Sequence, residues 1–145
     1  MFLTHWSSKP LTELRSVEPG PRRPGSPYSK PLGFWLSDES SEDSWSAWCA
    51  AEEFPIGSHR TDFRADLSNV LHLSSDTDLM RFHDEYVVRI YPDWERVGTE
   101  YKGILITPYA WNLRLELDWY YGWDCASGCF WDLSCLTPVE ARQAA

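Results

Sequence analysis

The sequence predicts a single α+β domain over residues 1–145, with a mixed or antiparallel sheet flanked by short helices. Two observations support this fold class. The chain has 145 residues and carries nine Trp, seven Tyr and six Phe, which is enough apolar surface for one packed core. Strand and helix patterns interleave irregularly, with the helices in the middle of the chain, whereas a doubly wound parallel sheet needs regular alternation.

Six segments have the alternation or the apolar content of strands. They cover residues 1–7, 32–37, 61–67, 69–73, 102–107 and 126–134. In "TDFRADL", for example, Phe63, Ala65 and Leu67 alternate with polar residues, as expected for a half-buried strand. The stretch 108–124 is ambiguous, because "LRLELDW" alternates like a strand but has no clear boundaries.

Three segments have helical spacing of apolar residues, and a fourth is long enough for one helical turn. The helices are expected over residues 43–54, 75–86 and 92–101, and the single turn over 10–17. Ser44 is positioned to cap the first helix, and Ser75 or Asp76 the second. The second helix then presents Leu79, Phe82 and Tyr86 as its apolar stripe.

Two regions lack such patterns. Residues 18–31 hold five Pro and two Gly, which predicts a mobile loop, and this loop carries Arg22 and Arg23. Residues 137–145 have the composition of a frayed C-terminal tail.

The charge balance excludes some partners. A net charge of −9 opposes nonspecific binding to nucleic acid and to anionic membranes. It still permits a local nucleotide pocket, because Arg side chains and backbone N–H groups act at short range. No apolar run reaches the roughly 18 residues of a membrane span, and the first ten residues contain no signal-peptide core. We therefore expect a cytoplasmic protein without a membrane partner.

The cysteines and histidines show no metal-ligand spacing. No two of the four Cys are separated by two residues, and the four His are scattered along the chain. We expect the cysteines to be reduced core residues of a cytosolic protein, with a disulfide or a metal site as the alternative. The cysteines are Cys49, Cys125, Cys129 and Cys135.

Three blocks combine polar groups with aromatic residues: "LTHWS", "KPLGFWLSDE" and "WYYGWDCASGCFWD". Aromatic walls with a few convergent polar groups are typical of a nucleotide-sized pocket. The competing interpretation is an aromatic core with incidental polar edges, since nine Trp must pack somewhere.

The order of these blocks resembles that of the ADP-ribosyltransferase fold, including its poly(ADP-ribose) polymerase-like and DNA-modifying toxin branches. "LTHWS" resembles the first-strand motif, "GFWLSDE" the second, and "ADLSNVLHL", "WERVGTEYKGILI" and "DCASGCFW" the later elements. The chain departs from the pattern at Trp35, where many members have Tyr. It also has no Glu in the last motif, where Asp124 is the nearest substitute and Asp132 lies behind it.

The resemblance implies a split sheet, NAD as substrate, and a role for each block. His5 would donate to a ribose hydroxyl, and Asp124 would stabilise the cation that develops on the ribose. Trp35 or Phe34 would stack on nicotinamide, and Ser37 or Ser7 would bond its carboxamide or the ribose. The remaining expected cofactor-binding residues are Arg22, Arg23 and Arg64 for the pyrophosphate, with Thr4 and Ser127 beside the motifs.

The expected function is NAD-dependent transfer of ADP-ribose to an unknown protein or nucleic-acid acceptor. A second hypothesis is a non-catalytic acidic interaction or inhibitor protein, of phage or bacterial origin, with "SDESSED" as its acidic segment. A solvated loop is the plainer interpretation of that run. A third hypothesis is a nucleotide-binding module that keeps the fold but has lost turnover.

Overall fold

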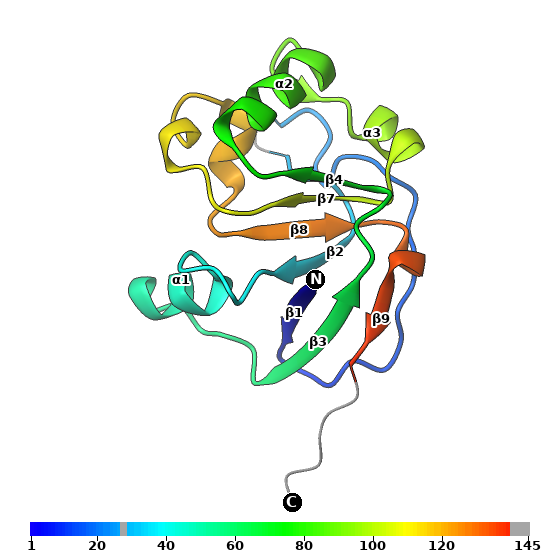
Figure 1. Cartoon of the computed structure of the whole chain (residues 1–145), viewed down its shortest axis with the longest axis vertical. Helices are drawn as coiled ribbons and strands as arrows, with labels where there is room; N and C mark the ends of the chain where they lie inside the picture. The colour runs from blue at the N-terminus through cyan, green and yellow to red at the C-terminus, as the bar shows by residue number, and fades with distance from the viewer. Residues whose placement is uncertain (27–28, 140–145) are drawn as a thin grey trace, which may run out of the picture.

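Seven strands form one curled mixed sheet in the order β4-β7-β8-β2-β1-β3-β9 (Figure 1). We describe it from a computed structural model, which covers residues 1–26 and 29–139. β4 and β7 are parallel, and the other neighbours are antiparallel. The strands are β1 (Phe2–Ser7), β2 (Phe34–Ser37), β3 (His59–Ala65), β4 (Val70–Leu73), β7 (Gly103–Ile106), β8 (Ser127–Phe130) and β9 (Leu136–Pro138).

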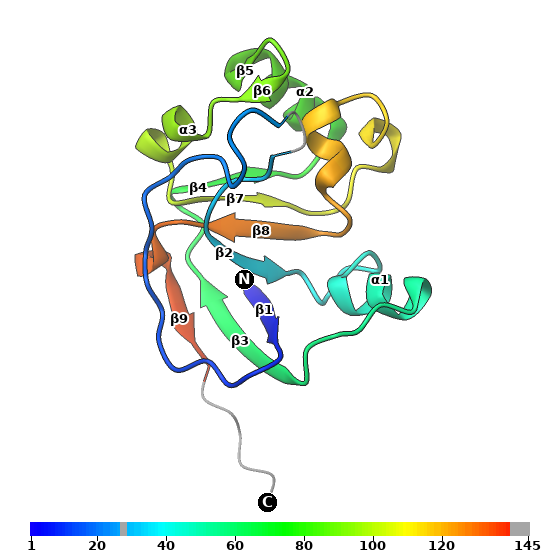
Figure 2. The ribbon, with the colours of Figure 1, turned by 180° about the vertical axis from the view of Figure 1, so that it is seen from behind.

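In the part of the chain that the structure describes, three α-helices flank the sheet, which confirms the expected α+β class. They are α1 (Trp45–Glu52), α2 (Asp76–Tyr86) and α3 (Trp94–Glu100), and β5 (Val87–Val88) pairs with β6 (Tyr91–Pro92) in a separate ribbon. The expected caps are present: Ser44 Oγ accepts from Ala47 N at 3.2 Å, and Ser75 Oγ accepts from Asp78 N at 3.1 Å. Figures 1 and 2 show that α2 and α3 lie together, whereas α1 stands apart at the end of β2.

The two faces of the sheet carry separate core clusters. On β7, Ile104 and Ile106 belong to the first cluster and Leu105 to the second, as strand alternation requires. The first cluster includes the expected α2 stripe together with Trp94 of α3. The second contains Leu3, Leu36 and Phe63, and Phe34 packs against it. The first cluster therefore lies between the sheet and the helices α2 and α3, and the second cluster lies on the opposite face of the sheet.

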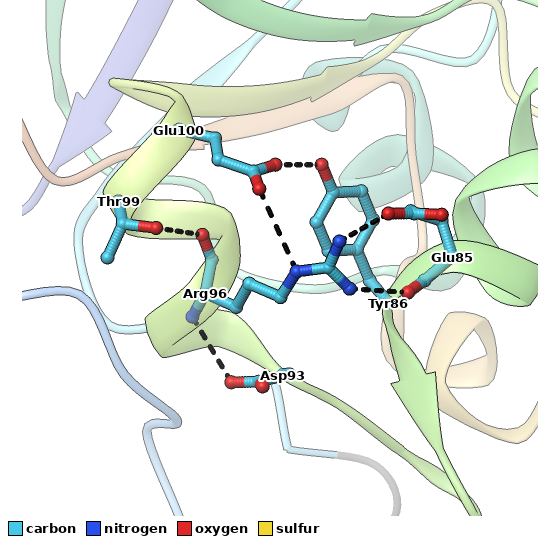
Figure 3. A network of polar contacts seen from close by, with 6 residues as sticks. All are labelled: Glu85, Tyr86, Asp93, Arg96, Thr99 and Glu100. Atoms are coloured by element: carbon cyan, nitrogen blue, oxygen red, sulfur yellow. Dashed lines mark hydrogen bonds and ion pairs between the residues drawn. The ribbon is translucent and has the colours of Figure 1, made fainter.

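An ion-pair network holds α2 against α3 (Figure 3). The Arg96 guanidinium donates to the Glu85 carbonyl oxygen at 2.8 Å and also to the Glu85 carboxylate. Its Nε lies 3.7 Å from a Glu100 oxygen, and the Tyr86 hydroxyl donates to the same carboxylate. Because Arg96 lies at the surface, we expect this network to orient the helices more than to stabilise the fold.

Three expectations are corrected by the structure. Residues 10–17 form no helical turn; instead Leu11 and Leu14 pack against the second core cluster. The alternating "LRLELDW" is not a strand: it begins at the end of the 3-10 helix η1 (Trp111–Leu113), continues through a turn at 114–116 and ends in the 3-10 helix η2 (Asp118–Gly122). Thr137 and Pro138 are not frayed, because they pair with β3 as part of β9, and Val139 N donates to Asp62 O at 2.9 Å. Residues 140–145 of the expected tail lie outside the described residues.

The Pro/Gly-rich segment is irregular, as expected, but its described residues are attached to the domain. Pro21 and Pro31 form an isolated β-bridge, and Arg22 N donates to Lys30 O at 2.8 Å. Trp94 Nε1 of α3 donates to Ser29 O at 3.1 Å. The segment therefore has a fixed course beside the sheet, with residues 27–28 outside the described part. None of the helices built from the described residues has the length and apolar character needed to cross a membrane.

Candidate functional site

A pocket of about 250 Å³ lies where β1, β2 and residues 123–127 meet. His5 and Asp124, from opposite ends of the chain, both line it, together with Trp35. The remaining lining residues are Thr4, Trp6, Arg22, Lys30, Leu36, Ser37, Trp45, Trp123, Cys125 and Ser127. The pocket thus contains residues from all three of the polar-aromatic blocks.

The β1–β2 pairing explains how His5 reaches this site. The two strands share only one register pair, Thr4 with Ser37, whereas β1 and β3 pair along six residues. His5 Nδ1 lies 2.8 Å from the carbonyl oxygen of Trp35 on the neighbouring strand. The His5 ring also stacks on Phe34, with centroids 4.3 Å apart and planes 23° apart. The imidazole therefore has a fixed position across the weakly paired part of the sheet.

This hydrogen bond determines which nitrogen of His5 is available to a ligand. A carbonyl oxygen only accepts, so Nδ1 carries the hydrogen and donates it. In the neutral ring, Nε2 is then an acceptor, and it has no hydrogen-bond partner among the described residues. A neutral His5 would accept from a ribose hydroxyl, whereas the resemblance implied that it would donate.

The Trp35 ring is part of the pocket wall and packs against Trp123 and Lys30. Its ring meets the edge of Trp123 at a centroid distance of 4.9 Å, and the Lys30 ammonium lies 5.3 Å from its centroid. Phe34 is not among the lining residues; its ring packs edgewise on Phe63 at 5.5 Å within the second core cluster. Of the two expected stacking residues, only Trp35 borders the pocket, and Phe34 instead supports His5.

The hydroxyl groups of the pocket are already bonded within the protein. Thr4 Oγ1 donates to Asp62 at 2.7 Å, and Ser127 Oγ donates to the Cys125 carbonyl at 3.1 Å. Ser37 Oγ donates to Glu39 at 2.5 Å and accepts from Trp45 N at 2.9 Å. These hydroxyl groups are therefore engaged within the protein: Thr4 joins β1 to β3, Ser37 joins β2 to α1, and Ser127 bonds locally at the start of β8.

The Asp62 carboxylate behind Thr4 stays ionised in this arrangement. Burial acts to raise its pKa, but the hydrogen bonds from Thr4 and Arg60 outweigh burial and hold the pKa of Asp62 below its ordinary value. Arg60 donates to Asp62 at 3.0 Å, and its guanidinium carbon lies 5.4 Å from the centroid of the Trp6 ring. Asp62 and Arg60 thus support the outer part of β1.

Other polar groups of the pocket have no internal partner. The Asp124 carboxylate and the Arg22 guanidinium form no hydrogen bond or ion pair with the described residues, and Lys30 has only its contact with Trp35. The indole Nε1 of Trp6 is buried without a hydrogen-bond partner. A buried donor without a partner is costly unless a water or a ligand satisfies it. The groups available to a ligand are therefore His5, Asp124 and the two cations, Arg22 and Lys30.

The Cys125 thiol is unsuited to nucleophilic chemistry although it lines the pocket. Burial raises its pKa to about 12, and the negative charge of Asp124 acts in the same direction. A thiol that stays protonated at neutral pH is a poor nucleophile. All four cysteines are buried and free, as expected of reduced core residues. Within residues 1–26 and 29–139, no group of three or more His, Cys, Asp or Glu side chains is arranged to hold a metal ion.

Several expected ligand-binding residues lie elsewhere. Ser7 donates to the Lys9 carbonyl at 2.6 Å, and Arg64 lies over the Phe2 ring at 5.6 Å; neither borders the pocket. Arg23 is also outside it, although its neighbour Arg22 is a lining residue. Sequence reasoning missed the contributions of Trp6, Lys30 and Trp45. No periodic signal marks Lys30, since its position depends on the course of an irregular loop.

The "SDESSED" run is more than a solvated loop. Asp38 is buried, and its carboxylate accepts from Thr107 Oγ1 at 2.6 Å and from Ser40 Oγ at 2.5 Å. Asp43 accepts from the Trp111 indole at 3.0 Å. The run therefore connects the end of β2 to the end of β7 and to η1.

Searches against protein-family models, curated proteins and solved structures find no match for this chain.

Proposed function

We propose that this protein is an NAD-dependent ADP-ribosyltransferase whose substrate site is the pocket of His5, Trp35 and Asp124. The observation that carries the proposal is that His5 and Asp124, far apart in sequence, line one pocket with the Trp35 ring. The motif order of the chain supplies the identity of the ligand, and the free polar groups of the pocket are compatible with it.

The size and charge of the pocket suit one end of the dinucleotide. Sites for drug-sized ligands measure about 300–1,000 Å³, so a volume near 250 Å³ accommodates nicotinamide and its ribose rather than all of NAD. Arg22 and Lys30 line the same pocket and form no ion pair with any residue that the structure describes. We place the pyrophosphate beside these two cations, because ammonium and guanidinium groups both bind phosphate oxygens.

The proposed reaction breaks the bond between nicotinamide N1 and ribose C1′. The bonding electron pair leaves with nicotinamide, which departs as a neutral molecule, and positive charge develops on the ribose. The acceptor nucleophile then bonds to C1′ and releases its proton to solvent. Asp124 stabilises the developing charge because its carboxylate has no competing partner in the described chain. His5 orients the ribose by accepting a hydroxyl hydrogen at Nε2.

Calorimetric titration with NAD, run beside an assay of nicotinamide release, tests the proposal. We expect NAD binding and measurable release, both lost in His5→Ala. Binding without release would contradict transfer and indicate the nucleotide-binding module. If NAD neither binds nor reacts, the proposal fails, and the non-catalytic interaction protein becomes the better account.

A further inference from the structure

We infer that the partly exposed aromatic surface formed by α1 and the residues just after it is a docking site for a cationic polypeptide segment. The surface, here called the α1 ledge, consists of Trp45, Trp48 and Phe54 with the unpaired carboxylates of Glu52 and Glu53. Binding at the ledge does not depend on the proposed transferase function. If the bound segment is also the acceptor of ADP-ribose, that role rests on the proposed function.

The helix that carries the ledge has almost no attachment to the core. Cys49 is the only buried residue of α1, and Phe54 and Ile56 beyond the helix are 50% and 39% exposed. Figures 1 and 2 show α1 projecting from the end of β2, away from α2 and α3. The half-buried rings of Trp45 and Trp48, together with the exposed ring of Phe54, leave this side of the helix open to a partner.

The aromatic side chains of the ledge form an ordered surface. The rings of Trp45 and Trp48 stack with centroids 5.0 Å apart and planes 10° apart. Phe54 packs its ring edgewise against both, at 5.8 Å and 5.4 Å. Trp45 also lines the pocket of His5 and Asp124, so the ledge is continuous with the pocket wall. A segment bound to the ledge would lie next to the proposed reaction site.

The charge around the ledge selects the kind of partner. The chain has no Lys or Arg between Lys30 and Arg60, whereas residues 38–53 contain six acidic residues. Asp38, Glu39 and Asp43 are engaged in internal hydrogen bonds. The other three residues, Glu42, Glu52 and Glu53, are exposed, and their carboxylates form no hydrogen bond or ion pair with the described residues.

Lys or Arg side chains match both features of this surface. A guanidinium or ammonium group is attracted to the face of Trp and pairs with free carboxylates. Stacked Trp rings would also suit nucleobases, but the unpaired carboxylates and the net charge of −9 repel a phosphate backbone. The ledge therefore favours a basic polypeptide over a nucleic acid.

The test is a binding titration without NAD, in which tryptophan fluorescence reports the binding. The probes are a synthetic peptide of alternating Arg and Leu, the matched Glu and Leu peptide, and single-stranded oligo(dT). The double variant Glu52→Lys/Glu53→Lys removes the ledge carboxylates. The double variant Glu13→Lys/Glu18→Lys changes the net charge equally at exposed positions outside the ledge.

We expect the Arg peptide alone to bind, with affinity reduced about tenfold in the ledge variant and less than about twofold in the control variant. Trp48→Leu, which keeps the helix and removes one ring of the stack, should weaken binding as well. Equal losses in the two double variants, binding of oligo(dT), or no binding of the Arg peptide would overturn the inference. Because NAD is absent, none of these results depends on whether the protein has transferase activity.

Discussion

His5 Nδ1 donates a hydrogen bond to the Trp35 carbonyl oxygen at 2.8 Å and so connects β1 to β2 beside their single register pair. The bond fixes the imidazole and leaves Nε2 as the nitrogen that can meet a ligand. The structural role and the proposed ligand-binding role of His5 therefore belong to different atoms, and substitutions can separate them.

His5→Asn should keep the hydrogen bond to Trp35 but lose the ligand-binding nitrogen and the ring stack on Phe34. An Asn amide nitrogen can replace Nδ1 as the donor to Trp35, but Asn has no counterpart of Nε2. We expect its free energy of unfolding to fall by about 0.5–1.5 kcal/mol, the worth of one aromatic pair, while nicotinamide release falls about 100-fold through lost positioning. Urea denaturation and the release assay measure the two quantities. Unchanged release in a folded His5→Asn protein would rule out a ribose contact by His5.

Asp124→Asn should reduce turnover without a matching loss of NAD affinity. The carboxylate is proposed to act on charge that exists only in the transition state, so we expect kcat for nicotinamide release to fall about 10²–10³-fold. Asp132→Asn is the matched control, because Asp132 lies outside the pocket and caps the following 3-10 helix, accepting from Ser134 N at 3.0 Å. Equal effects of the two substitutions on kcat would contradict a special role for Asp124.

Thr107→Val should destabilise the fold by breaking the buried bond to Asp38. The Asp38 oxygen that accepts from Thr107 at 2.6 Å would lose this donor in a buried site. We expect a loss of about 1–3 kcal/mol in the free energy of unfolding. Thr107→Ser retains the hydroxyl and should recover most of that loss. If Thr107→Val, which keeps a methyl group at this position, is as stable as wild type, the hydrogen bond to Asp38 does not stabilise the fold.

The buried thiols should make the fold less stable at alkaline pH. Burial raises the pKa of Cys125 to about 12 and also raises that of Cys129. An unfolded thiol ionises near pH 8.5, so the unfolded state loses its proton first. The stabilisation is thus complete below about pH 8.5 and declines as pH rises toward about 12, by about 1.4 kcal/mol per thiol between pH 7.5 and 9.5.

Urea denaturation at these two pH values measures the decline in the free energy of unfolding. Cys125→Ala should reduce that decline by about 1.4 kcal/mol, the contribution of one thiol. A decline that Cys125→Ala leaves unchanged would show that Cys125 ionises alike in both states.

Much of the fold could be predicted because local signals and burial agree. The apolar strands around Leu3 and Ile104, and the helices capped by Ser44 and Ser75, lie where their patterns indicate. The pattern of residues 113–119 wrongly indicates a strand, because short 3-10 helices do not impose a recognisable spacing of apolar residues. There the burial of the consecutive residues Trp119 and Tyr120 overrides the alternation of the residues before them.

The sequence could predict which three polar-aromatic segments form the candidate site, but not which of their side chains line the pocket. Whether Phe34 or Trp35 borders the pocket depends on strand register, and β8 sets that register by pairing Trp35 with Cys129. Since one step along a strand reverses the face, the motif alone could not choose between them. Likewise Arg22 and Lys30, but not Arg23, reach the pocket through the course of an irregular loop.

A crystal structure of the protein soaked with NAD tests the central claim most directly. The account predicts nicotinamide against the Trp35 ring, its ribose between His5 Nε2 and the Asp124 carboxylate, and the pyrophosphate beside Arg22 and Lys30. Density for NAD at another site, or an unchanged pocket in a crystal soaked at saturating NAD, would contradict it.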